Sequence, residues 1–557
     1  MLKKLLCIIA LFSFSNNSFS QNRFVIRFTN KTNTPFSINN PLAFLSQRAV
    51  DRRNAHGIAI DQSDLPVDPI YIQQVSNITG VTILNHSKWF NSVTVELTSP
   101  SILSSINALP FVLSSVLVGR PAGTGETNIN KYNLNEQGPV LNSFPSVARL
   151  ASFNYGNAQN QTSMININAL HDLGFSGQGM IIAVIDGGFQ DADIMGCFDS
   201  LFSQGSVLST WDFVSNNANV YDDFWHGSAV LSTMAANVPG DMVGTAPNAQ
   251  YILLRSEEVL SEYIIEEYNW ASAAEFADSA GADVINSSLG YTEFDDPTQN
   301  HTYADMDGNT CPATIAADIA ASKGILVVNS AGNEGNNSFH YISSPADGNF
   351  VLGIGAVNSS GSYASFSSQG PSFDGRVKPD VAAQGQGAAV FMPGNTLSSF
   401  SSGTSFSGPI IAGAVACLRQ RFPAKSNIEI MDAVRQSASQ YATPDGMLGY
   451  GIPDFGVASL VLGGYELSLF SDGLEVIDFY PNPLKSGSTL NFRFFNRYME
   501  SVSIDLLDAT GKVISRQTID TSTSVIPVEI DTKLSGGIYF LRAATESKTV
   551  MKKLVVY

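Results

Sequence analysis

Five short apolar segments separated by helical stretches restrict the fold of this chain more than any other feature. The apolar segments are residues 180–185, 251–254, 283–286, 325–329 and 351–357. The helical stretches lie around residues 226–236, 264–280 and 312–322. Buried strands that alternate with helices are typical of a parallel sheet covered on both faces. The sequence therefore predicts an α/β domain over residues 147–465.

The segments on either side of this domain have different sequence patterns. Residues 21–120 combine short alternating strands with helical stretches, which predicts a small α+β domain. Residues 121–146 are rich in Gly, Asn and Pro and lack periodicity, so we expect an exposed linker that proteases can cut. Residues 474–557 contain short alternating strands separated by turn signals, which predicts a β-sandwich.

The pattern of residues 1–20 predicts that the protein is exported from the cytoplasm. Lys3 and Lys4 precede an apolar run over residues 5–14, and polar residues follow it. This is the pattern of a signal peptide, and the run is too short to span a membrane. The formal net charge of -19 over 557 residues argues against nucleic-acid binding, which usually needs a basic surface. We therefore expect a secreted globular protein.

Three cysteines remain after the predicted signal peptide, which contains Cys7, is removed: Cys197, Cys311 and Cys417. An odd number excludes a fully paired disulfide framework. Cys417 lies in an apolar helical run and is expected to pack as a small hydrophobic residue. A disulfide between Cys197 and Cys311 stays open, because sequence alone does not determine connectivity.

Two titratable residues stand where a site could form. Asp186 ends the first predicted strand and is followed by two glycines. Ligands gather at the carboxyl ends of parallel strands, so Asp186 would stand at the binding edge. His226 begins a helical run of small residues, a setting that the other histidines lack. Taken singly, Asp186 also fits a turn, and His226 also fits a surface or structural role.

Asn333 and Ser405 are two further candidates. Asn333 follows the strand at residues 325–329 and could project its amide into the same crevice, although asparagine is also common in turns. Ser405 precedes Pro409, which we expect in the first turn of an apolar helix. Ser405 would then lie near a helix N-terminus, where unpaired N–H groups favour developing negative charge.

Together these residues form an ordered set of an acid, a histidine, an amide and a serine. The motifs are Asp186-Gly187-Gly188, His226-Gly227-Ser228, Ala331-Gly332-Asn333 and residues 403–409. The set resembles the subtilisin-like serine peptidases, the subtilase family, over about residues 150–465. The resemblance implies that Ser405 attacks a peptide carbonyl while His226, oriented by Asp186, acts as base. It also implies that Asn333 and the Ser405 N–H bind the oxyanion.

The resemblance extends to a cleft that binds an extended peptide as an added strand, with an S1 pocket between two segments. The residues implied to line the cleft are Ser287, Ser288, Leu289 and Gly290 in one segment and Ala331 and Gly332 in the other. Two positions depart from the family motifs: Gly187 replaces a hydroxyl residue, and Ala229 replaces a second histidine. Neither position transfers a proton, so we interpret both as variation.

No cofactor is expected for the chemistry, but subtilases commonly bind structural calcium. Asp305 and Asp307 offer alternating oxygen ligands beside Gly308, as calcium loops do. The rest of an EF-hand loop is missing, and a solvated turn is the favoured alternative.

Both flanking domains also resemble known types. The α+β domain looks like a subtilase propeptide, which assists folding and inhibits the enzyme. The C-terminal domain resembles a type IX secretion sorting domain, which directs export across the outer membrane. Its signatures are residues 479–483, 536–539 and 552–557. A carbohydrate- or protein-binding sandwich is the alternative for this domain.

The leading hypothesis is a secreted serine endopeptidase made as a zymogen and acting as a monomer on peptides or proteins. Its expected partners are the substrate and the type IX secretion machinery, with no nucleic acid, and its location is secreted or at the outer cell surface. A catalytically silent surface adhesin with the same fold is the alternative. A serine esterase is disfavoured, because the residues around Ser405 do not match G-x-S-x-G.

Overall fold

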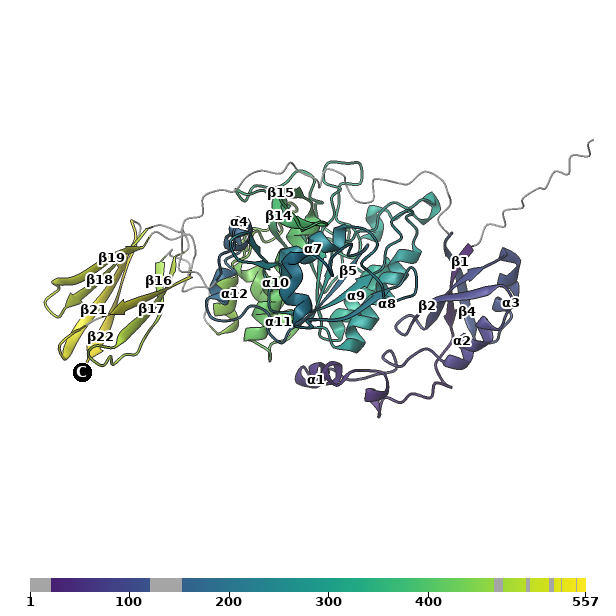
Figure 1. Cartoon of the computed structure of the whole chain (residues 1–557), viewed down its shortest axis with the longest axis horizontal. Helices are drawn as coiled ribbons and strands as arrows, with labels where there is room; N and C mark the ends of the chain where they lie inside the picture. Colours follow the sequence, from purple (N-terminus) through teal and green to yellow (C-terminus); the bar gives the residue numbers. More distant parts are fainter. Residues whose placement is uncertain are drawn as a thin grey trace, which may run out of the picture.

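The computed structural model describes residues 22–120, 153–464, 474–496, 501–519, 525–531, 533–546 and 548–557. The predicted signal peptide and the predicted linker at residues 121–146 lie outside the described residues. Three units follow one another along the chain: an N-terminal α+β unit, a central α/β unit and a C-terminal β unit (Figure 1).

The N-terminal unit is built on an antiparallel sheet of order β2-β3-β1-β4. Its strands are β1 (Asn22–Phe28), β2 (Val81–Ser87), β3 (Ser92–Leu97) and β4 (Val112–Gly119). Helices α2 (Pro69–Ser76) and α3 (Leu103–Asn107) contribute Tyr71, Val75 and Ile106 to the core of this sheet. Helix α1 (Gln47–Ala55) instead lies apart from the sheet, beneath the central unit in Figure 1.

The central unit contains a seven-stranded parallel sheet of order β13-β12-β11-β10-β5-β9-β6, which confirms the predicted α/β class. The strands are β5 (Ile181–Asp186), β6 (Val207–Asp212), β9 (Gln250–Arg255), β10 (Val284–Ser287), β11 (Leu326–Ser330), β12 (Val351–Val357) and β13 (Val381–Gln384). The five predicted apolar segments all became strands. Strand β6 was not predicted, because it lies at an edge and is only partly buried.

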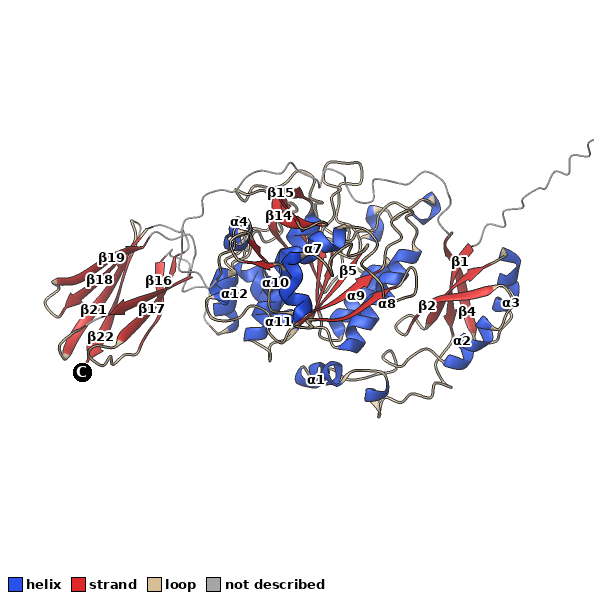
Figure 2. Ribbon diagram, in the orientation of Figure 1, coloured by secondary structure: helices blue, strands red, loops and turns tan. Residues whose placement is uncertain are grey.

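Helices cover both faces of this sheet (Figure 2). One face packs against α7 (His226–Ala235), α10 (Thr404–Arg421), α11 (Asn427–Ser437) and α12 (Phe455–Leu462), and the other against α8 (Ile265–Ala280) and α9 (Pro312–Ser322). Along β5, Ile182 and Val184 enter the first core, while Ile181, Ala183 and Ile185 enter the second. Because successive side chains of a strand point to opposite faces, both faces need apolar residues, which explains the continuous apolar run.

Shorter elements complete the central unit. They include α4 (Gln159–Met164), α5 (Asn168–His171), α6 (Asp199–Ser203) and the strand pairs β7 (Asn237–Val238) with β8 (Met242–Val243) and β14 (Gln386–Met392) with β15 (Thr396–Ser402).

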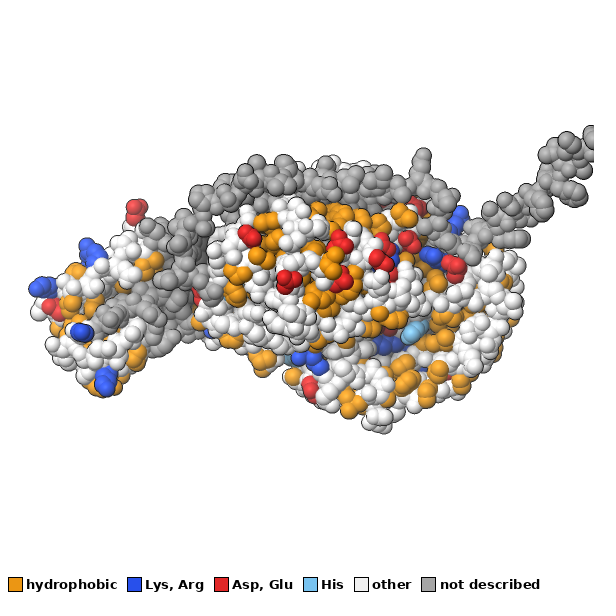
Figure 3. All heavy atoms as spheres, viewed as in Figure 1, with side chains coloured by type: hydrophobic (Ala, Val, Ile, Leu, Met, Phe, Trp, Pro, Cys, Tyr) orange, Lys and Arg blue, Asp and Glu red, His pale blue; other side chains and the backbone are white. Residues whose placement is uncertain are grey.

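Within the described part of the chain, no helix combines the length and apolar character that crossing a membrane requires. On the face drawn in Figure 3, acidic side chains are scattered among apolar ones over this unit.

The C-terminal unit consists of two antiparallel sheets of order β16-β17-β20 and β19-β18-β21-β22. Their strands are β16 (Leu474–Tyr480), β17 (Thr489–Asn496), β18 (Val502–Asp508), β19 (Val513–Ile519), β20 (Val525–Asp531), β21 (Gly537–Ala544) and β22 (Thr549–Val556). Phe492 and Phe494 of the first sheet share a core with Leu506 and Leu541 of the second. This is the predicted sandwich arrangement.

The N-terminal unit docks on helix α8 through buried charges. Asp278 of α8 forms ion pairs with Arg52, Arg53 and Lys88, at distances of 2.5, 2.9 and 3.1 Å. Glu275, one turn earlier, accepts hydrogen bonds from the backbone N–H groups of Lys88 and Trp89. A cavity of about 600 Å³ remains between the two units and is lined by residues of both. The contact therefore joins the two units through charged groups as well as apolar packing.

The three described cysteines are free and buried. The disulfide between Cys197 and Cys311 that the sequence left open is therefore not formed. Cys197 belongs to the core on the α7 and α10 side of the sheet, whereas Cys311 caps the start of α9 on the opposite side. Cys417 packs in the same core as Cys197, as expected for a small hydrophobic residue.

Candidate active site

Asp186 and His226 meet at the edge of the central sheet. Asp186 is the last residue of β5, and His226 is the first residue of α7. The Nδ1 atom of His226 lies 2.8 Å from Oδ1 and 3.1 Å from Oδ2 of Asp186, and both side chains are fully buried. With Nδ1 held as a donor to the carboxylate, Nε2 is the atom of the neutral ring that accepts a proton.

The glycines beside these residues allow the strand end and the helix start to touch. The N–H of Gly227 donates to the carbonyl oxygen of Gly188 across 3.0 Å. A Cβ atom on Gly227 would lie 2.3 Å from that same oxygen. The carboxylate of Asp186 is held by the N–H of Gly187 at 2.7 Å. Gly187, where the family motif has a hydroxyl residue, thus supports Asp186 through its backbone.

Ser405 is the second residue of α10, which begins at Thr404. Its N–H lies in the first helical turn, where amide groups have no acceptor within the helix. The prediction that Pro409 lies in the first turn of the helix was wrong. The proline lies inside the helix, four residues after Ser405. A proline cannot donate to the carbonyl four residues earlier. The Ser405 carbonyl instead accepts a hydrogen bond from the hydroxyl of Ser288, 3.0 Å away.

The amide of Asn333 has a defined orientation. Its Oδ1 atom accepts hydrogen bonds from the backbone N–H of Thr404 at 2.9 Å and from the Thr404 hydroxyl at 3.0 Å. The amide NH₂ group therefore points away from Thr404, while Ser405 follows Thr404 directly. The orienting role of Thr404 was missed in the sequence, although its place beside Ser405 in the motif is a signal for it.

Two aromatic rings flank His226. The ring centroid of Trp225 lies 5.6 Å from that of His226, and the ring centroid of Phe406 lies 6.2 Å from it. Because Phe406 follows Ser405, this contact brings the start of α10 beside the histidine. The sequence did not single out either aromatic residue, since large side chains are common around buried helices.

The two predicted substrate segments lie close together. Ser343 donates its N–H to the Ala331 carbonyl at 3.1 Å, and the next residue, Ser344, accepts from the N–H of Tyr291 at 2.9 Å. Ser343 and Ser344 are consecutive, so their two hydrogen bonds link the segment at residues 331–332 to Tyr291, the residue after Gly290. The Leu289 carbonyl accepts from the Asn329 amide at 2.9 Å. The hydroxyl of Ser287 is buried and accepts from the Trp270 indole at 3.0 Å, so it faces helix α8.

The carboxylates of Asp305 and Asp307 bind groups of their own loop. Asp305 accepts from the N–H and hydroxyl of Thr302, and Asp307 accepts from Asn309 and Thr310. The calcium site stays a prediction. Elsewhere in the described residues, two groups bring ligand atoms within 4.8 Å of one another: Glu257 with Glu262 and Glu266, all buried, and Glu267 with His301 and Cys311, of which His301 is partly buried.

Three protein-family models match successive parts of the chain. The model of the subtilase family matches residues 177–451. The model of the peptidase S8 propeptide domain of Bacteroidota matches residues 23–133. The model of the secretion system C-terminal sorting domain matches residues 478–557. A sorting domain of this kind marks a protein for secretion and export to the outer cell surface, so that location is supported.

Comparison with individual proteins identifies subtilisins. Subtilisin from Bacillus pumilus is 34% identical over 281 residues, which cover 50% of this chain and 90% of that protein. Subtilisin E from Bacillus subtilis is also 34% identical over 281 residues, but these cover only 65% of its length. A crystal structure of MycP1 from Mycobacterium smegmatis is 21% identical, covers 58% of this chain and 89% of that one, and superposes with a TM-score of 0.45.

Proposed function

Because this chain belongs to the subtilase family, we propose that it is a secreted serine endopeptidase, made as a zymogen, which cleaves peptide bonds through Asp186, His226 and Ser405. The observation that carries the proposal is the buried hydrogen bond of 2.8 Å between His226 and Asp186. A buried histidine paired with a carboxylate, beside a serine at a helix start, is the arrangement that nucleophilic acyl transfer requires.

In the first half of the reaction, the Ser405 hydroxyl oxygen attacks the carbonyl carbon of the substrate. Its proton passes to Nε2 of His226, and the imidazolium is stabilised by Asp186. When the tetrahedral intermediate collapses, the C–N bond breaks and His226 gives that proton to the leaving amine. In the second half, His226 deprotonates a water molecule, which attacks the carbonyl carbon of the acyl-enzyme. When this second intermediate collapses, the bond to the Ser405 oxygen breaks, His226 returns the proton to that oxygen, and the carboxylic acid product is released.

The oxyanion of the intermediate would be held by two donors. One is the backbone N–H of Ser405, in the first turn of α10, where the helix dipole also favours negative charge. The other is the amide NH₂ of Asn333, whose orientation follows from the two hydrogen bonds that Thr404 donates to Oδ1. Under this proposal both donors are in position before substrate binds, and they would need no reorganisation during the reaction.

The proposed substrate is an extended stretch of peptide or protein that lies between residues 288–290 and residues 331–332. Backbone groups in such segments can pair with a peptide as a neighbouring strand would. The N-terminal unit would keep the enzyme inactive until the linker is cut. The C-terminal unit would engage the type IX secretion machinery.

A direct test compares wild type with Ser405→Ala on a fluorogenic peptide library. Both proteins carry an engineered protease site in residues 121–146, so that both are cut at the same place. We expect the Ser405→Ala variant to lose activity by about 10⁴-fold or more. The matched control is Ser360→Ala, which changes a hydroxyl in an exposed turn and should keep full activity.

The alternative of a silent adhesin makes a different prediction. If cut wild type and Ser405→Ala are equally inactive while subtilisin E cleaves the library, the chain has the fold without the activity. A fluorophosphonate that labels active serines gives a second readout, since it should label wild type and not Ser405→Ala.

A further inference from the structure

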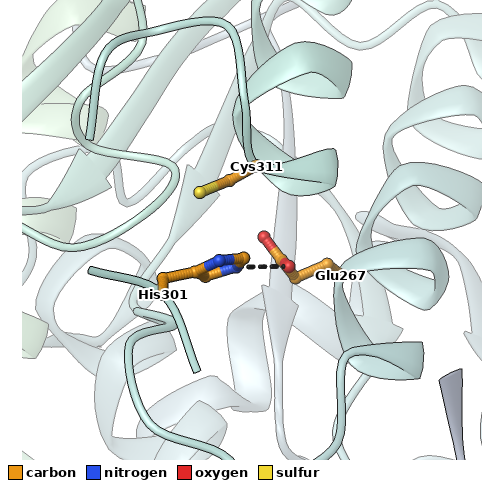
Figure 4. A group of neighbouring side chains, drawn as sticks. All are labelled: Glu267, His301 and Cys311. Atoms are coloured by element: carbon orange, nitrogen blue, oxygen red, sulfur yellow. Dashed lines mark hydrogen bonds and ion pairs between the residues drawn. The ribbon is translucent and has the colours of Figure 1, made fainter. Parts of the chain in front are cut away.

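Glu267, His301 and Cys311 form a compact buried group on the α8 and α9 side of the sheet (Figure 4). Glu267 comes from the first turn of α8, Cys311 is the N-cap residue of α9, and His301 comes from the loop between β10 and α9. Glu267 and Cys311 are fully buried, and the His301 side chain is 8% exposed. One ligand atom from each residue lies within 4.8 Å of the others.

We propose that these three side chains bind a structural zinc ion. Thiolate sulfur, imidazole nitrogen and carboxylate oxygen are the ligands of protein zinc sites. A calcium or magnesium ion is disfavoured, because those ions take oxygen ligands. Ligands of one ion at 2.0–2.3 Å lie roughly 3–4 Å apart. The separations here are at most 4.8 Å, so the longer ones must shorten, while the 2.8 Å between Glu267 and His301 must lengthen slightly. The inference does not depend on peptidase activity.

The groups around the site orient the ligands. Oε1 of Glu267 accepts hydrogen bonds from the hydroxyl of Ser344 at 3.1 Å and from the N–H of Ala313 at 3.3 Å. Oε2 is thereby turned towards His301, whose Nε2 lies 2.8 Å away. Hydrogen bonds of this kind hold a metal ligand in the orientation that binding needs and raise the affinity of the site for the ion.

Cys311 needs the ion to become a thiolate. It is the N-cap residue of an 11-residue helix, but burial and the nearby carboxylates of Glu267 and Asp347 raise the pKa of its thiol, so the charge of a bound cation must stabilise the thiolate. The thiol donates to the carbonyl oxygen of Asp305, 3.5 Å away, and this hydrogen bond is lost when the thiolate binds the ion. A water molecule would complete four-coordination. On binding, the thiol of Cys311 loses its proton to solvent, and His301 binds as a neutral ring whose one proton is on Nδ1, so that Nε2 is free to act as a ligand. The His301–Glu267 hydrogen bond is then replaced by two bonds to the ion.

An ion at this place would restrict the movement of one wall of the proposed substrate cleft. The N–H of His301 donates to the carbonyl of Thr292 at 2.8 Å, and Thr292 lies two residues beyond Gly290. The ion would therefore tie the segment that continues from residues 288–290 to the starts of α8 and α9. This consequence for the cleft, unlike the binding itself, rests on the proposed function.

The test uses the full chain with Ser405→Ala, which prevents self-digestion, and measures bound zinc after extensive dialysis. We expect one equivalent of zinc. Cys311→Ser should reduce the bound zinc to background, and the affinity of this variant for zinc should be lower by about 100-fold or more. Cys197→Ser is the matched control, because it removes another buried thiol outside the group and should keep the zinc.

Cobalt substitution reports on the ligands without any variant. The Co²⁺-loaded protein should show a sulfur-to-cobalt charge-transfer band and tetrahedral visible bands, and the Cys311→Ser protein should lack the charge-transfer band. Ser344→Ala should weaken binding by about 10-fold to 100-fold with the spectrum retained. The proposal is overturned if the unaltered site binds neither ion, or if Co²⁺ binds without the sulfur band. Either result would mean that the group is a closed hydrogen-bonded cluster only.

Discussion

The hydroxyl of Ser288 donates to the carbonyl oxygen of Ser405 across 3.0 Å, in the place of the backbone donor that Pro409 lacks. In an α-helix this carbonyl would receive the N–H of the residue four positions later. A residue of the proposed substrate cleft therefore satisfies a carbonyl in the first turn of α10. This hydrogen bond directly connects the residue of the proposed nucleophile with the proposed cleft.

Removing the Ser288 hydroxyl should leave the buried Ser405 carbonyl without its donor. We expect Ser288→Ala to lower the free energy of unfolding by about 1–3 kcal/mol. The measurement is a double-mutant cycle with Pro409→Ala, because alanine restores the backbone N–H that the carbonyl can accept. In the Pro409→Ala background the loss should shrink by more than half. Equal losses in both backgrounds would show that the hydrogen bond is not the cause.

Asn333→Ala should lower kcat by about 10²-fold to 10³-fold and change KM little, because an oxyanion donor acts in the transition state. Steady-state kinetics on one fluorogenic peptide measure this. Asn337→Ala, four residues later in an exposed position, is the matched control. A change confined to KM would instead assign Asn333 to ground-state binding.

Gly227→Ala should disrupt the contact between the end of β5 and the start of α7. The added methyl group would lie 2.3 Å from the Gly188 carbonyl, far inside van der Waals contact. We expect a loss of about 3 kcal/mol or more in unfolding free energy, measured with denaturant. Gly196→Ala is the control, since its nearest atom would be 3.4 Å away. Equal stabilities of the two variants would contradict the steric argument.

Asp278→Asn should loosen the N-terminal unit. The change leaves Arg52, Arg53 and Lys88 without their shared buried carboxylate, at a cost of about 3–5 kcal/mol. After cleavage of the linker in a Ser405→Ala background, size-exclusion chromatography should show the unit released from the variant and retained by the parent. Asp432→Asn removes an exposed ion pair and should retain the unit.

Acidification below neutral pH should also weaken this docking through His56. Burial, together with the nearby Arg419 and Arg52 cations, lowers the pKa of His56 below its usual 6.5, whereas Glu429 and Asp283 oppose the shift. Nε2 of His56 lies 3.0 Å from the Arg419 guanidinium, which donates to the neutral ring. The docked state thus binds fewer protons than the free unit, so its stability is present above pH 6.5 and is lost as pH falls.

The corresponding measurement is retention of the cut N-terminal unit as a function of pH. His56→Gln keeps an acceptor for Arg419 but does not titrate, so it should flatten the dependence around pH 6.5. A wild-type curve that is flat there, or a variant curve that is unchanged, would assign the pH dependence to other groups.

Much of the fold followed from local patterns. The apolar segment at residues 351–357 and the helix at residues 312–322 have the predicted bounds, because continuous burial and a proline at the helix start are local signals. Strand β6 and the start of α10 were not located correctly. An edge strand has a weak apolar pattern. The donor that Pro409 lacks is supplied by Ser288, more than a hundred residues earlier, which no local pattern reveals.

The sequence by itself determined the α/β class, the order of the three units and the identity of the four candidate catalytic residues, because short motifs at strand and helix ends carry that information. Only the tertiary structure decided which groups meet. It placed Asp186 against His226, turned the Asn333 amide by way of Thr404, and left Cys197 and Cys311 unpaired on opposite sides of the sheet. It also gathered Glu267, His301 and Cys311, since proximity between distant segments depends on how the helices pack on the sheet rather than on any local pattern.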